Sequence, residues 1–347
     1  MILPFPAVRM KEREGEAAMA GRERWRRGVP LFQMAALAGG GLAASQALVS
    51  TWAGELAASW SPHVALFVLA VAVAALWARR WRWLAVQGVV LLALMATMVN
   101  PILDSAQVMA RQAVPGGEGM RLAFANLNID NREISALAAW LAAQDADVIV
   151  VTEVLLRHMD VLEAALAAYR WRLAEPRPHA FGQVVFSRLP ILEMQTVVLD
   201  AGSWESPLPL LAIVSVDTGN GVLHVAGLHP YPPLMPGSAP ERDAQLRQAG
   251  LLLAQLPGAK VVTGDFNATA WSPALRAFAH SAGLRGFNLK PTWPSPLGPA
   301  GIAIDHALVG DGLVITAPET SPRLGSDHRA IVVDLAPVGA QGSPGTP

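Results

Sequence analysis

Three stretches without Asp, Glu, Lys or Arg fill most of the first third of the chain, at residues 28–54, 56–78 and 83–103. Each is about as long as a helix that crosses a bilayer, which needs roughly 20 apolar residues. They contribute to a composition that is 52% hydrophobic and only 15% charged, which is unusual for a soluble domain. The sequence therefore predicts an N-terminal bundle of three transmembrane helices. A cleaved signal peptide is the alternative for the first stretch, although such peptides normally begin their apolar run nearer the N-terminus.

Basic residues around these stretches predict an orientation in the membrane. Residues 1–27 are rich in Arg, the first loop carries only Glu55, and the second loop carries Arg79, Arg80 and Arg82. Because Lys and Arg are enriched in cytoplasmic loops, the basic segment and the second loop are expected in the cytoplasm. Three spans then make this a multi-pass protein of the inner (cell) membrane, with the rest of the chain on the periplasmic or extracellular side.

The rest of the chain predicts one folded domain between two irregular segments. Residues 104–118 are typical of a linker, and residues 337–347 are rich in Pro, Gly and Ser and are expected to be disordered. Residues 119–336 are enough for a single large core. The chain has no cysteine, so disulfides, thiol catalysis and Cys-ligated metals are excluded. Any metal must be held by oxygen or histidine.

The apolar runs of this domain predict an α/β sandwich. Residues 121–128 and 147–154 have the pattern of strands around a short helix, which favours a parallel pair. Residues 210–218 and 221–229 have the pattern of an antiparallel hairpin. A helix and three further strands are predicted at residues 241–256, 261–267, 301–310 and 328–335. Parallel and antiparallel strands mixed with helices are typical of a sandwich.

Five of these strands end in polar side chains of the kinds that bind hard cations and move protons. They are Asn126, Glu153, His229, Asp265 with Asn267, and Asp327 with His328, and Asp305 with His306 adds a further pair. Strand ends on one edge of a sheet converge, which is where open α/β folds place their sites. A simpler interpretation is that Asp265 or Asn267 caps a helix starting near Ser272. The repetition at five strand ends favours a shared site.

The motifs around these residues are FANLN, VVTEV, GLHPYPP, VVTGDFNAT, AIDHALV and GSDHRAIVVDL. In this order and spacing they resemble the endonuclease/exonuclease/phosphatase superfamily, over about residues 119–336, and GDFN together with SDHR is the most specific part. The three N-terminal stretches resemble a membrane-attached bacterial subgroup of that superfamily. The resemblance implies a DNase I-like four-layer α/β sandwich, here preceded by the transmembrane bundle, that hydrolyses phosphoester bonds with Mg²⁺ or Mn²⁺.

The resemblance also implies roles for individual residues. Asp265 would orient or deprotonate the attacking water, and Asn267 would hold the scissile phosphate. If strand geometry continues through this motif, both side chains point to the same side. His328, with its ring aligned by Asp305, would bind the phosphate or transfer a proton. His229 would bind the substrate and stabilise the pentacovalent phosphorus.

The metal ligands are predicted from the preference of Mg²⁺ for oxygen. Glu153 is the first candidate, Asn126 is the second, and Asp327 would complete the shell. Asn128 could replace Asn126 if the strand register differs by two residues.

Three further residues are assigned from their positions beside these motifs. Arg188 and His179, within and before the strand-like run GQVVFSRLPI, are candidates to flank the site, with Arg188 binding substrate. A solvated edge accounts for both equally well. His306 follows Asp305 on a strand, so it is expected to point the other way and to be structural.

Charge bears on the substrate. From Glu118 onward the chain has 15 Lys and Arg against 21 Asp and Glu, whereas a protein that grips a long nucleic acid usually carries a basic surface. This disfavours a processive or duplex-specific nuclease. A membrane tether makes a phospholipid or another envelope phosphodiester an alternative substrate, so a lipid phosphodiesterase or phosphatase is the second hypothesis. A non-catalytic binding module is the third, and it would not need both His229 and His328. No stable protein partner is predicted.

Overall fold

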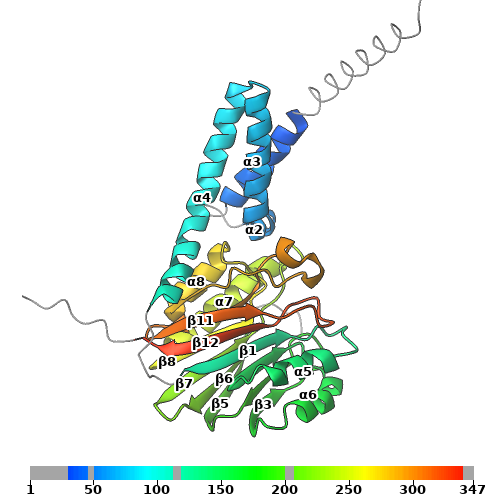
Figure 1. Ribbon diagram of the computed structural model, residues 1–347, viewed down its shortest axis with the longest axis vertical. Coiled ribbons are helices and arrows are strands. Elements are labelled where there is room, and N and C mark those ends of the chain that lie inside the picture. Colours follow the sequence, from blue (N-terminus) through cyan, green and yellow to red (C-terminus); the bar gives the residue numbers. More distant parts are fainter. Residues whose placement is uncertain (1–29, 46–50, 112–118, 200–206, 339–347) are drawn as a thin grey trace, which may run out of the picture.

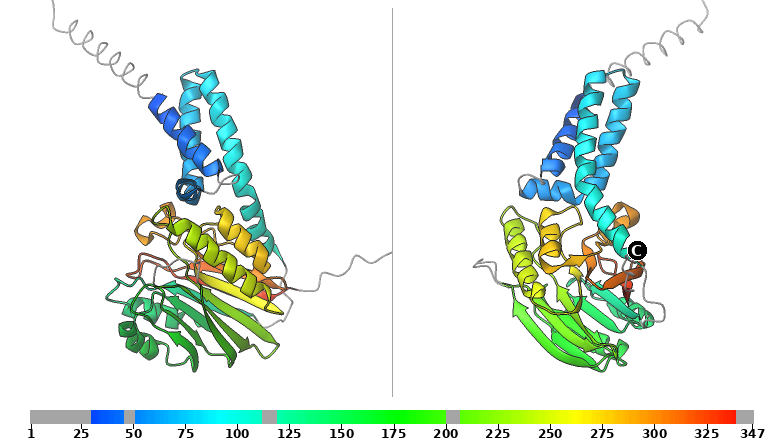
Figure 2. Two further views of the ribbon diagram at one scale, coloured as in Figure 1. Left: turned by 180° about the vertical axis from the view of Figure 1, so that it is seen from behind. Right: turned by 90° about the vertical axis from the view of Figure 1, so that its left-hand side faces the viewer.

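The computed structural model describes residues 30–45, 51–111, 119–199 and 207–338. They form an elongated helical unit and a larger domain of strands and helices below it (Figure 1). The longest helix of the unit runs down into the larger domain, so the two parts are in contact (Figure 2). The predicted basic segment at residues 1–27, and the predicted tail at 337–347 apart from its first two residues, lie outside the described residues.

Residues 30–45 of the helical unit are helical. The helices that follow are α2 (Trp52–Ser59), α3 (Ser61–Trp77) and α4 (Trp81–Ala110). The pair α2 and α3 is bent by 79°, because Pro62 in the first turn of α3 has no backbone N–H with which to continue α2. With 30 residues, α4 is about 45 Å long at a rise of roughly 1.5 Å per residue.

Within the described residues, α4 is the one helix long and apolar enough to cross a membrane, and the bent pair α2 and α3 is a second candidate if it counts as one span. The predicted bundle of three transmembrane helices is therefore not supported. The second predicted span, residues 56–78, contains the bend at Trp60, and the first, residues 28–54, lies partly outside the described residues. The uncharged stretches correctly predicted where the apolar segments lie, but they do not show where a helix bends.

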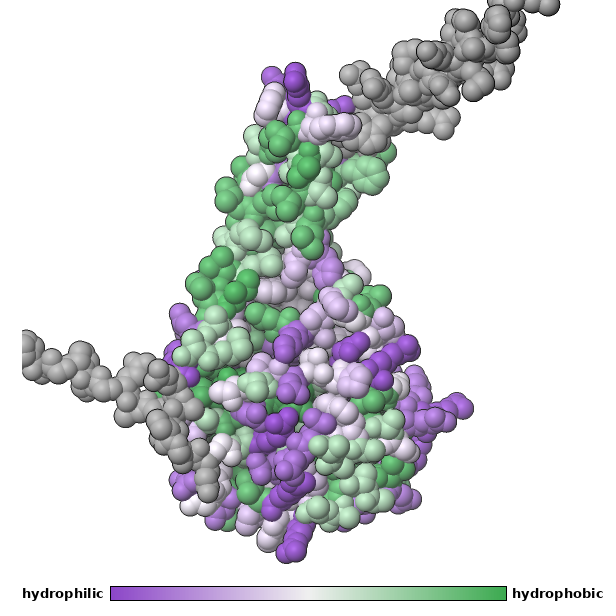
Figure 3. Space-filling view, in the orientation of Figure 1, coloured by the Kyte–Doolittle hydropathy of each residue, from purple (hydrophilic) through white to green (hydrophobic). Residues whose placement is uncertain are grey.

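The exposed surface of the N-terminal helices is largely apolar (Figure 3). Leu66, Leu92 and Trp77 leave 66%, 72% and 80% of their surface exposed. Polar groups are more frequent on the strand domain below (Figure 3). Large contiguous apolar surfaces are typical of proteins that contact lipid or another protein.

The end of α4 corrects the predicted linker at residues 104–118. The helix continues through the first part of this segment, and its last turns pack against the strand domain. Asp104 Oδ2 accepts a hydrogen bond from the Gly286 N–H at 3.0 Å, and Val108 is buried in the core of the domain. Residues 112–118 lie outside the described residues. The segment is helical because its side chains have partners on the domain, which a local pattern does not show.

Two six-stranded sheets pack against each other, with strand orders β11-β12-β1-β2-β4-β3 and β5-β6-β7-β8-β10-β9. The first contains β1 (Met120–Asn126), β2 (Val148–Thr152), β3 (Trp171–Glu175), β4 (Gln183–Ser187), β11 (Leu313–Thr320) and β12 (Ile331–Pro337). The second contains β5 (Ile191–Val198), β6 (Leu210–Asp217), β7 (Val222–Leu228), β8 (Ala259–Asp265), β9 (Leu284–Arg285) and β10 (Asp305–Gly310). Apolar side chains from both sheets, among them Val150, Val214 and Val261, form the core between them.

Helices cover the outer face of each sheet. They are α5 (Ser135–Ala143) and α6 (Met159–Ala165) on the first sheet, and α7 (Ser238–Ala254) and α8 (Pro273–Ala282) on the second (Figure 2). Short 3-10 segments lie at Leu156–His158 and Ser295–Ala300. The layer order helix, sheet, sheet, helix agrees with the predicted α/β sandwich. Strands such as β2 explain this order, because all of its residues are buried. Such a strand is stable only when one face packs on the other sheet and the opposite face packs on helices.

The strand pairings that position the site agree with the sequence in two cases. β1 and β2 are parallel, with Asn126 opposite Thr152, and β6 and β7 form the predicted hairpin. The strands predicted at residues 301–310 and 328–335 belong to different sheets. β10 pairs with β8 and β9, whereas β12 pairs with β1 and with β11, a strand that the sequence analysis missed.

Candidate active site

Strand ends from both sheets meet at one edge of the sandwich. In the first sheet Asn126 ends β1 beside the end of β2, and Glu153 follows β2 directly. In the second sheet β7 and β8 end side by side, which places His229 next to Asp265. β10 is antiparallel to β8, with Asp305 opposite Asp265. The predicted convergence of strand ends is confirmed for these residues.

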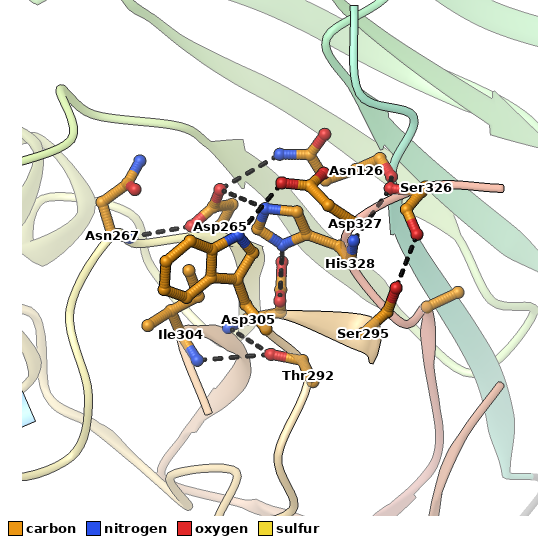
Figure 4. Close-up of polar contacts among 12 residues, drawn as sticks. Asn126, Asp265, Asn267, Thr292, Ser295, Ile304, Asp305, Ser326, Asp327 and His328 are labelled. Carbon is orange, nitrogen blue, oxygen red and sulfur yellow. Dashed lines mark hydrogen bonds and ion pairs between the residues drawn. The ribbon is translucent and has the colours of Figure 1, made fainter. Parts of the chain in front are cut away.

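Asp265 lies at the centre of this cluster and is 2% exposed. Its Oδ1 accepts a hydrogen bond from the Asn267 N–H at 2.9 Å, and its Oδ2 accepts one from Asn126 Nδ2 at 3.1 Å. The same Oδ2 lies 3.5 Å from His229 Nε2 and 3.6 Å from His328 Nε2. Figure 4 shows the carboxylate among Asn126, Asn267 and His328. One buried carboxylate oxygen therefore faces two imidazole rings.

The backbone around Asp265 explains the glycine before it. A Cβ on Gly264 would lie 1.8 Å from the Leu228 carbonyl oxygen on β7, so no other residue fits there. The strand then ends, and Asn267 has a φ of +50°. Its Nδ2 donates to the Pro230 carbonyl at 3.0 Å. The condition that strand geometry continues through Asn267 is not met, because β8 ends at Asp265 and the Asn267 N–H bonds the Asp265 carboxylate.

Helix capping does not account for this motif. Ser272 is the N-cap of α8, and its hydroxyl accepts from the Leu275 N–H at 3.4 Å. Asp265 and Asn267 lie before that cap and make the contacts described above.

Glu153 and Asn126 are held together, but not through the amide oxygen of Asn126. Glu153 Oε1 accepts from Asn126 Nδ2 at 2.9 Å, and its Oε2 accepts from the Ile129 N–H at 2.8 Å. Asn126 Oδ1 accepts from the Asn128 N–H at 2.9 Å. That N–H turns the amide so that its nitrogen faces the two carboxylates. The structure therefore shows Asn126 as a hydrogen-bond donor to Glu153 and Asp265, and its role as an oxygen ligand of a metal stays a prediction.

The ring of His229 is oriented for contact with both carboxylates. Its Nδ1 lies 3.2 Å from the Ala180 carbonyl oxygen, and a carbonyl can only accept, so Nδ1 carries the proton. Nε2 is left to face Asp265, and Glu153 Oε1 is 4.0 Å away. Phe181 packs against the ring at a centroid distance of 5.4 Å. The three groups Glu153, His229 and Asp265 each offer a ligand atom within 4.8 Å of the others.

This donor set fits a hard divalent cation. Two carboxylate oxygens supply the charge and the oxygen donors that Mg²⁺ and Mn²⁺ favour. The imidazole nitrogen is presented by a ring whose other nitrogen is fixed by a carbonyl, as is usual for metal-binding histidines. A second group, Asp265 with Asp305 and His328, meets the same distance limit.

His328 and Asp305 form a buried pair. His328 Nδ1 lies 2.9 Å from Asp305 Oδ2, and Asp305 is fully buried. Burial by itself lowers the pKa of the His328 ring, but the carboxylates of Asp305 and Asp265 outweigh it and raise the pKa to about 10. The ring is therefore an imidazolium at neutral pH. Its Nε2–H is beyond hydrogen-bonding distance of Asp265 and can be given to a substrate oxygen.

The charged His328 ring predicts a pH-dependent contribution to stability. Its folded pKa of about 10 exceeds the ordinary value of 6.5, so the contribution is fully present below about pH 6.5 and is lost as the pH rises through about 10. We expect His328→Gln to lower the melting temperature much more at about pH 7 than at about pH 10.5. His280→Gln, at an exposed position, is the control. An equal loss at both pH values would contradict the assignment.

His306, next to Asp305 on β10, has a structural environment, as expected. Its Nε2 donates to the Ala268 carbonyl at 2.9 Å, and its Nδ1 accepts from the Asn288 N–H at 3.1 Å. Burial lowers its pKa to about 4. The neutral ring therefore ties the loop after Asp265 to the loop before β10.

Asp327 lies at the rim of the cluster. Its Oδ1 accepts from Asn128 Nδ2 at 2.7 Å and its Oδ2 accepts from Trp293 Nε1 at 3.0 Å. It belongs to neither group of possible metal ligands found among the described residues. The role of Asp327 in the metal shell stays a prediction. Asn128 is bonded to Asp327, which leaves Asn126 as the asparagine at the carboxylates.

Arg188 does not flank the site, which corrects its prediction as a substrate-binding residue. β4 is antiparallel to β2, with Gln183 opposite Thr152 at the site edge. Arg188 follows the far end of β4, about 17 Å away at roughly 3.3 Å per residue. There its guanidinium bonds Asp145 and lies 4.9 Å from the Tyr169 ring centroid. The direction of a strand depends on its partner, which the apolar run alone does not show.

Three supporting residues were missed by the sequence analysis. The Thr292 hydroxyl accepts from the Asp305 N–H at 3.3 Å. Ser326 Oγ donates to the Asn126 carbonyl at 2.8 Å and accepts from the His328 N–H at 3.0 Å, which joins two strand ends (Figure 4). The third is Arg242, whose Nη1 donates to the Asn267 carbonyl at 3.0 Å. A single hydroxyl or arginine has no sequence pattern that marks it as a site residue. Only Ser326 could have been predicted, because in GSDH it directly precedes the candidate residues Asp327 and His328.

Comparison with known proteins adds a family to this geometry. The sequence pattern of the Endonuclease/Exonuclease/phosphatase family matches residues 123–328, which is more than half of the chain and includes the Asp265 cluster. No curated protein matches the sequence.

Several solved structures share the fold. An endonuclease/exonuclease/phosphatase from Beutenbergia cavernae is 21% identical with a TM-score of 0.55, over 65% of this chain and 73% of that one. One from Bacteroides vulgatus is 18% identical with a TM-score of 0.53, over 63% and 99%. TDP2 from D. rerio, complexed with a single strand DNA product, is 14% identical with a TM-score of 0.52, also over 63% and 99%. Likeness at these identities shows the fold alone.

Proposed function

The chain belongs to the endonuclease/exonuclease/phosphatase family. We therefore propose that it is a divalent-metal-dependent phosphoesterase that hydrolyses phosphodiester bonds, with its active site in the cluster around Asp265. The observation that carries the proposal is the position of the Asp265 carboxylate. It is buried, it lies within 3.6 Å of two imidazole nitrogens, and it is grouped with Glu153 and His229 as possible metal ligands. This combination offers a proton acceptor, a positive charge and a cation site in one place.

Glu153 would hold the cation, with the Asp265 and His229 atoms of the same group within its reach. When bound, such a cation neutralises phosphate charge and lowers the pKa of a coordinated water. Asn126 contributes by holding Glu153 and Asp265 side by side through its amide nitrogen. Magnesium is the proposed ion and manganese the alternative, since both accept carboxylate oxygen.

Other side chains of the cluster would transfer protons and bind the phosphate. Asp265 Oδ2 would accept the proton of the attacking water, because it is the anionic oxygen between the two rings. The His328 imidazolium would donate Nε2–H to a phosphate oxygen, and Asp305 keeps that ring charged and aligned. His229 would complete the cation site through Nε2, since its Nδ1–H is held by the Ala180 carbonyl and no second N–H is left for the phosphoryl group.

The N-terminal helices are proposed to anchor the enzyme in the inner membrane, with the catalytic domain outside the cytoplasm. Two observations support this. α4 is apolar and largely unburied. Arg79 and Arg80 lie in the turn between α3 and α4 and Arg82 lies in the first turn of α4, and this turn is at the end of the unit far from the domain (Figure 1). A span between a basic turn and the domain places them on opposite sides of the bilayer.

A topology experiment tests the orientation. An alkaline phosphatase reporter fused after Pro347 is expected to be active, because that enzyme works only outside the cytoplasm. The same reporter fused after Arg82 is expected to be inactive. Activity of the second fusion without the first would reverse the proposed orientation.

A lipid phosphodiesterase is the second candidate function. It is favoured by the contact between the helical unit and the site edge, where Trp52 Nε1 donates to the Pro233 carbonyl at 2.9 Å, four residues after His229. If the helices lie in a bilayer, the site is held near the lipid headgroups. The acidic balance of the domain agrees with a substrate other than long nucleic acid.

A substrate panel on the detergent-solubilised full chain tests both candidates. Single-stranded DNA, duplex DNA, RNA, phospholipid vesicles and inositol phosphates are compared with an activated phosphodiester in Mg²⁺ or Mn²⁺. We expect hydrolysis of the activated diester, and of phospholipid in preference to duplex DNA. Activity confined to phosphomonoesters would leave the site standing and overturn the diester assignment.

A further inference from the structure

A buried arginine links the N-terminal helices to the turn that carries Asn267. Arg242 of α7 is 0% exposed. A buried guanidinium is costly unless its donors have acceptors and its charge has a partner. The identity of those acceptors therefore shows what holds this part of the domain together.

The ion-pair and hydrogen-bond partners of Arg242 come from three segments, and the contact with Glu55 is an ion pair. Nη2 lies 3.0 Å from Glu55 Oε1 and 2.7 Å from Asp243 Oδ1, and Nε lies 3.1 Å from the same Asp243 oxygen. Nη1 donates to the Asn267 carbonyl at 3.0 Å. One side chain thus joins α2, α7 and the end of β8.

The Asn267 peptide is held on both sides by charged groups. Its N–H donates to Asp265 Oδ1, and its carbonyl accepts from Arg242. Its φ of +50° is unusual for a residue with a Cβ and persists only where surrounding contacts enforce it. The Asn267 peptide therefore links the Arg242 guanidinium to the Asp265 carboxylate.

Glu55 supplies a counter-charge from outside the matched family segment, which begins at residue 123. It lies on α2 and its side chain is 3% exposed. Trp52 of the same helix bonds the Pro233 carbonyl, so α2 is docked on the domain at two points. The helical unit thus contributes directly to the support of the site.

We propose that Glu55 and Arg242 are positioning residues of the active site. Glu55 orients Arg242, and Arg242 holds the Asn267 turn that presents Asp265. The N-terminal helices are then a structural part of the catalytic centre as well as a tether. This inference rests on the proposed function for its kinetic test, and it has a separate structural test.

Kinetics of full-chain variants provide the first test. Arg242→Ala is expected to lower kcat by about 100-fold, since a displacement of about 1 Å at a reacting group can have that effect. Glu55→Ala is expected to lower kcat by about 10-fold with little change in KM. Glu55→Gln keeps a polar side chain of the same size beside the guanidinium while removing the charge, and is expected to retain more activity than Glu55→Ala. The double variant Glu55→Ala, Arg242→Ala is expected to be no slower than Arg242→Ala, because Glu55 acts through the arginine.

Matched controls separate positioning from general destabilisation. Arg247→Ala changes an exposed arginine of the same helix, and Glu133→Gln changes an exposed glutamate; both are expected to keep wild-type kcat. If Arg242→Ala fails to fold, the test uses the kcat values of Glu55→Ala and Glu55→Gln instead. The proposal would be overturned by a wild-type kcat in Glu55→Ala. It would also be overturned if the reduction of kcat in the double variant equalled the product of the two single reductions.

Hydrogen exchange provides the test that needs no activity. In Glu55→Ala, amides of residues 266–271 are expected to exchange faster than in the wild type, while amides of β3 at the distant sheet edge are unchanged. Unchanged exchange at residues 266–271 would overturn the coupling. If the wild type hydrolyses no phosphodiester but exchange responds as expected, the proposed function fails and the positioning role stands.

Discussion

Replacing Asp265 by Asn is expected to lower kcat for an activated phosphodiester by about 10²–10⁴-fold, the range for removal of a general base. The substitution keeps the size of the side chain, and its one amide oxygen can still accept from the Asn267 N–H, whereas the bond from Asn126 Nδ2 to the second oxygen is lost. It removes the anionic oxygen that faces both imidazole rings. The effect should therefore appear in kcat and kcat/KM together, as for an interaction made in the transition state.

Asp311→Asn is the control for this variant. Asp311 has an exposed side chain near Arg111 and Arg285, outside the Asp265 cluster, and its substitution is expected to leave kcat unchanged. The measurement is steady-state hydrolysis by purified full-length protein with matched circular dichroism spectra. A folded Asp265→Asn variant with a rate within about threefold of the wild type would exclude Asp265 as the base.

Metal removal has the second large expected effect. EDTA is expected to abolish hydrolysis, and Mg²⁺ or Mn²⁺ is expected to restore it, because Glu153, His229 and Asp265 offer ligand atoms within 4.8 Å. Glu153→Gln removes one of the two anionic ligands. Its rate is expected to fall by at least about 100-fold at a metal concentration that saturates the wild type, with partial recovery at higher concentration.

Two comparisons decide whether Glu153 acts through the cation. Glu163→Gln, at a solvent-accessible ion pair with Arg172, is expected to show the wild-type metal dependence. Isothermal titration of Mn²⁺ should give weaker binding to Glu153→Gln than to the wild type. Full activity in EDTA after exhaustive dialysis would rule out the metal-dependent mechanism, and unchanged Mn²⁺ affinity would remove Glu153 from the cation site.

Much of the site could be predicted, because strand ends can be recognised from local sequence and neighbouring strand ends meet at one edge of a sheet. Asn126, Glu153, His229, Asp265 and Asp305 each border a strand, and parallel or antiparallel neighbours bring such ends to one edge. The pairing of His328 with Asp305 also agrees with the prediction.

The failures have physical causes that lie outside any local pattern. Arg188 was misplaced because an apolar run does not reveal which way a strand crosses its sheet. Residues 104–110 are helical because the domain supplies partners for Asp104 and Val108.

The sequence by itself determined the apolar N-terminal third, the alternation of strands and helices, and the residue types at the strand ends, because each is written in adjacent or regularly spaced side chains. Only the tertiary structure decided which atom of each side chain faces the cluster and that Glu55 reaches Arg242 and, through it, Asn267. Those contacts join segments far apart in the chain. Their geometry is set by how the two sheets, α7 and the N-terminal helices pack together.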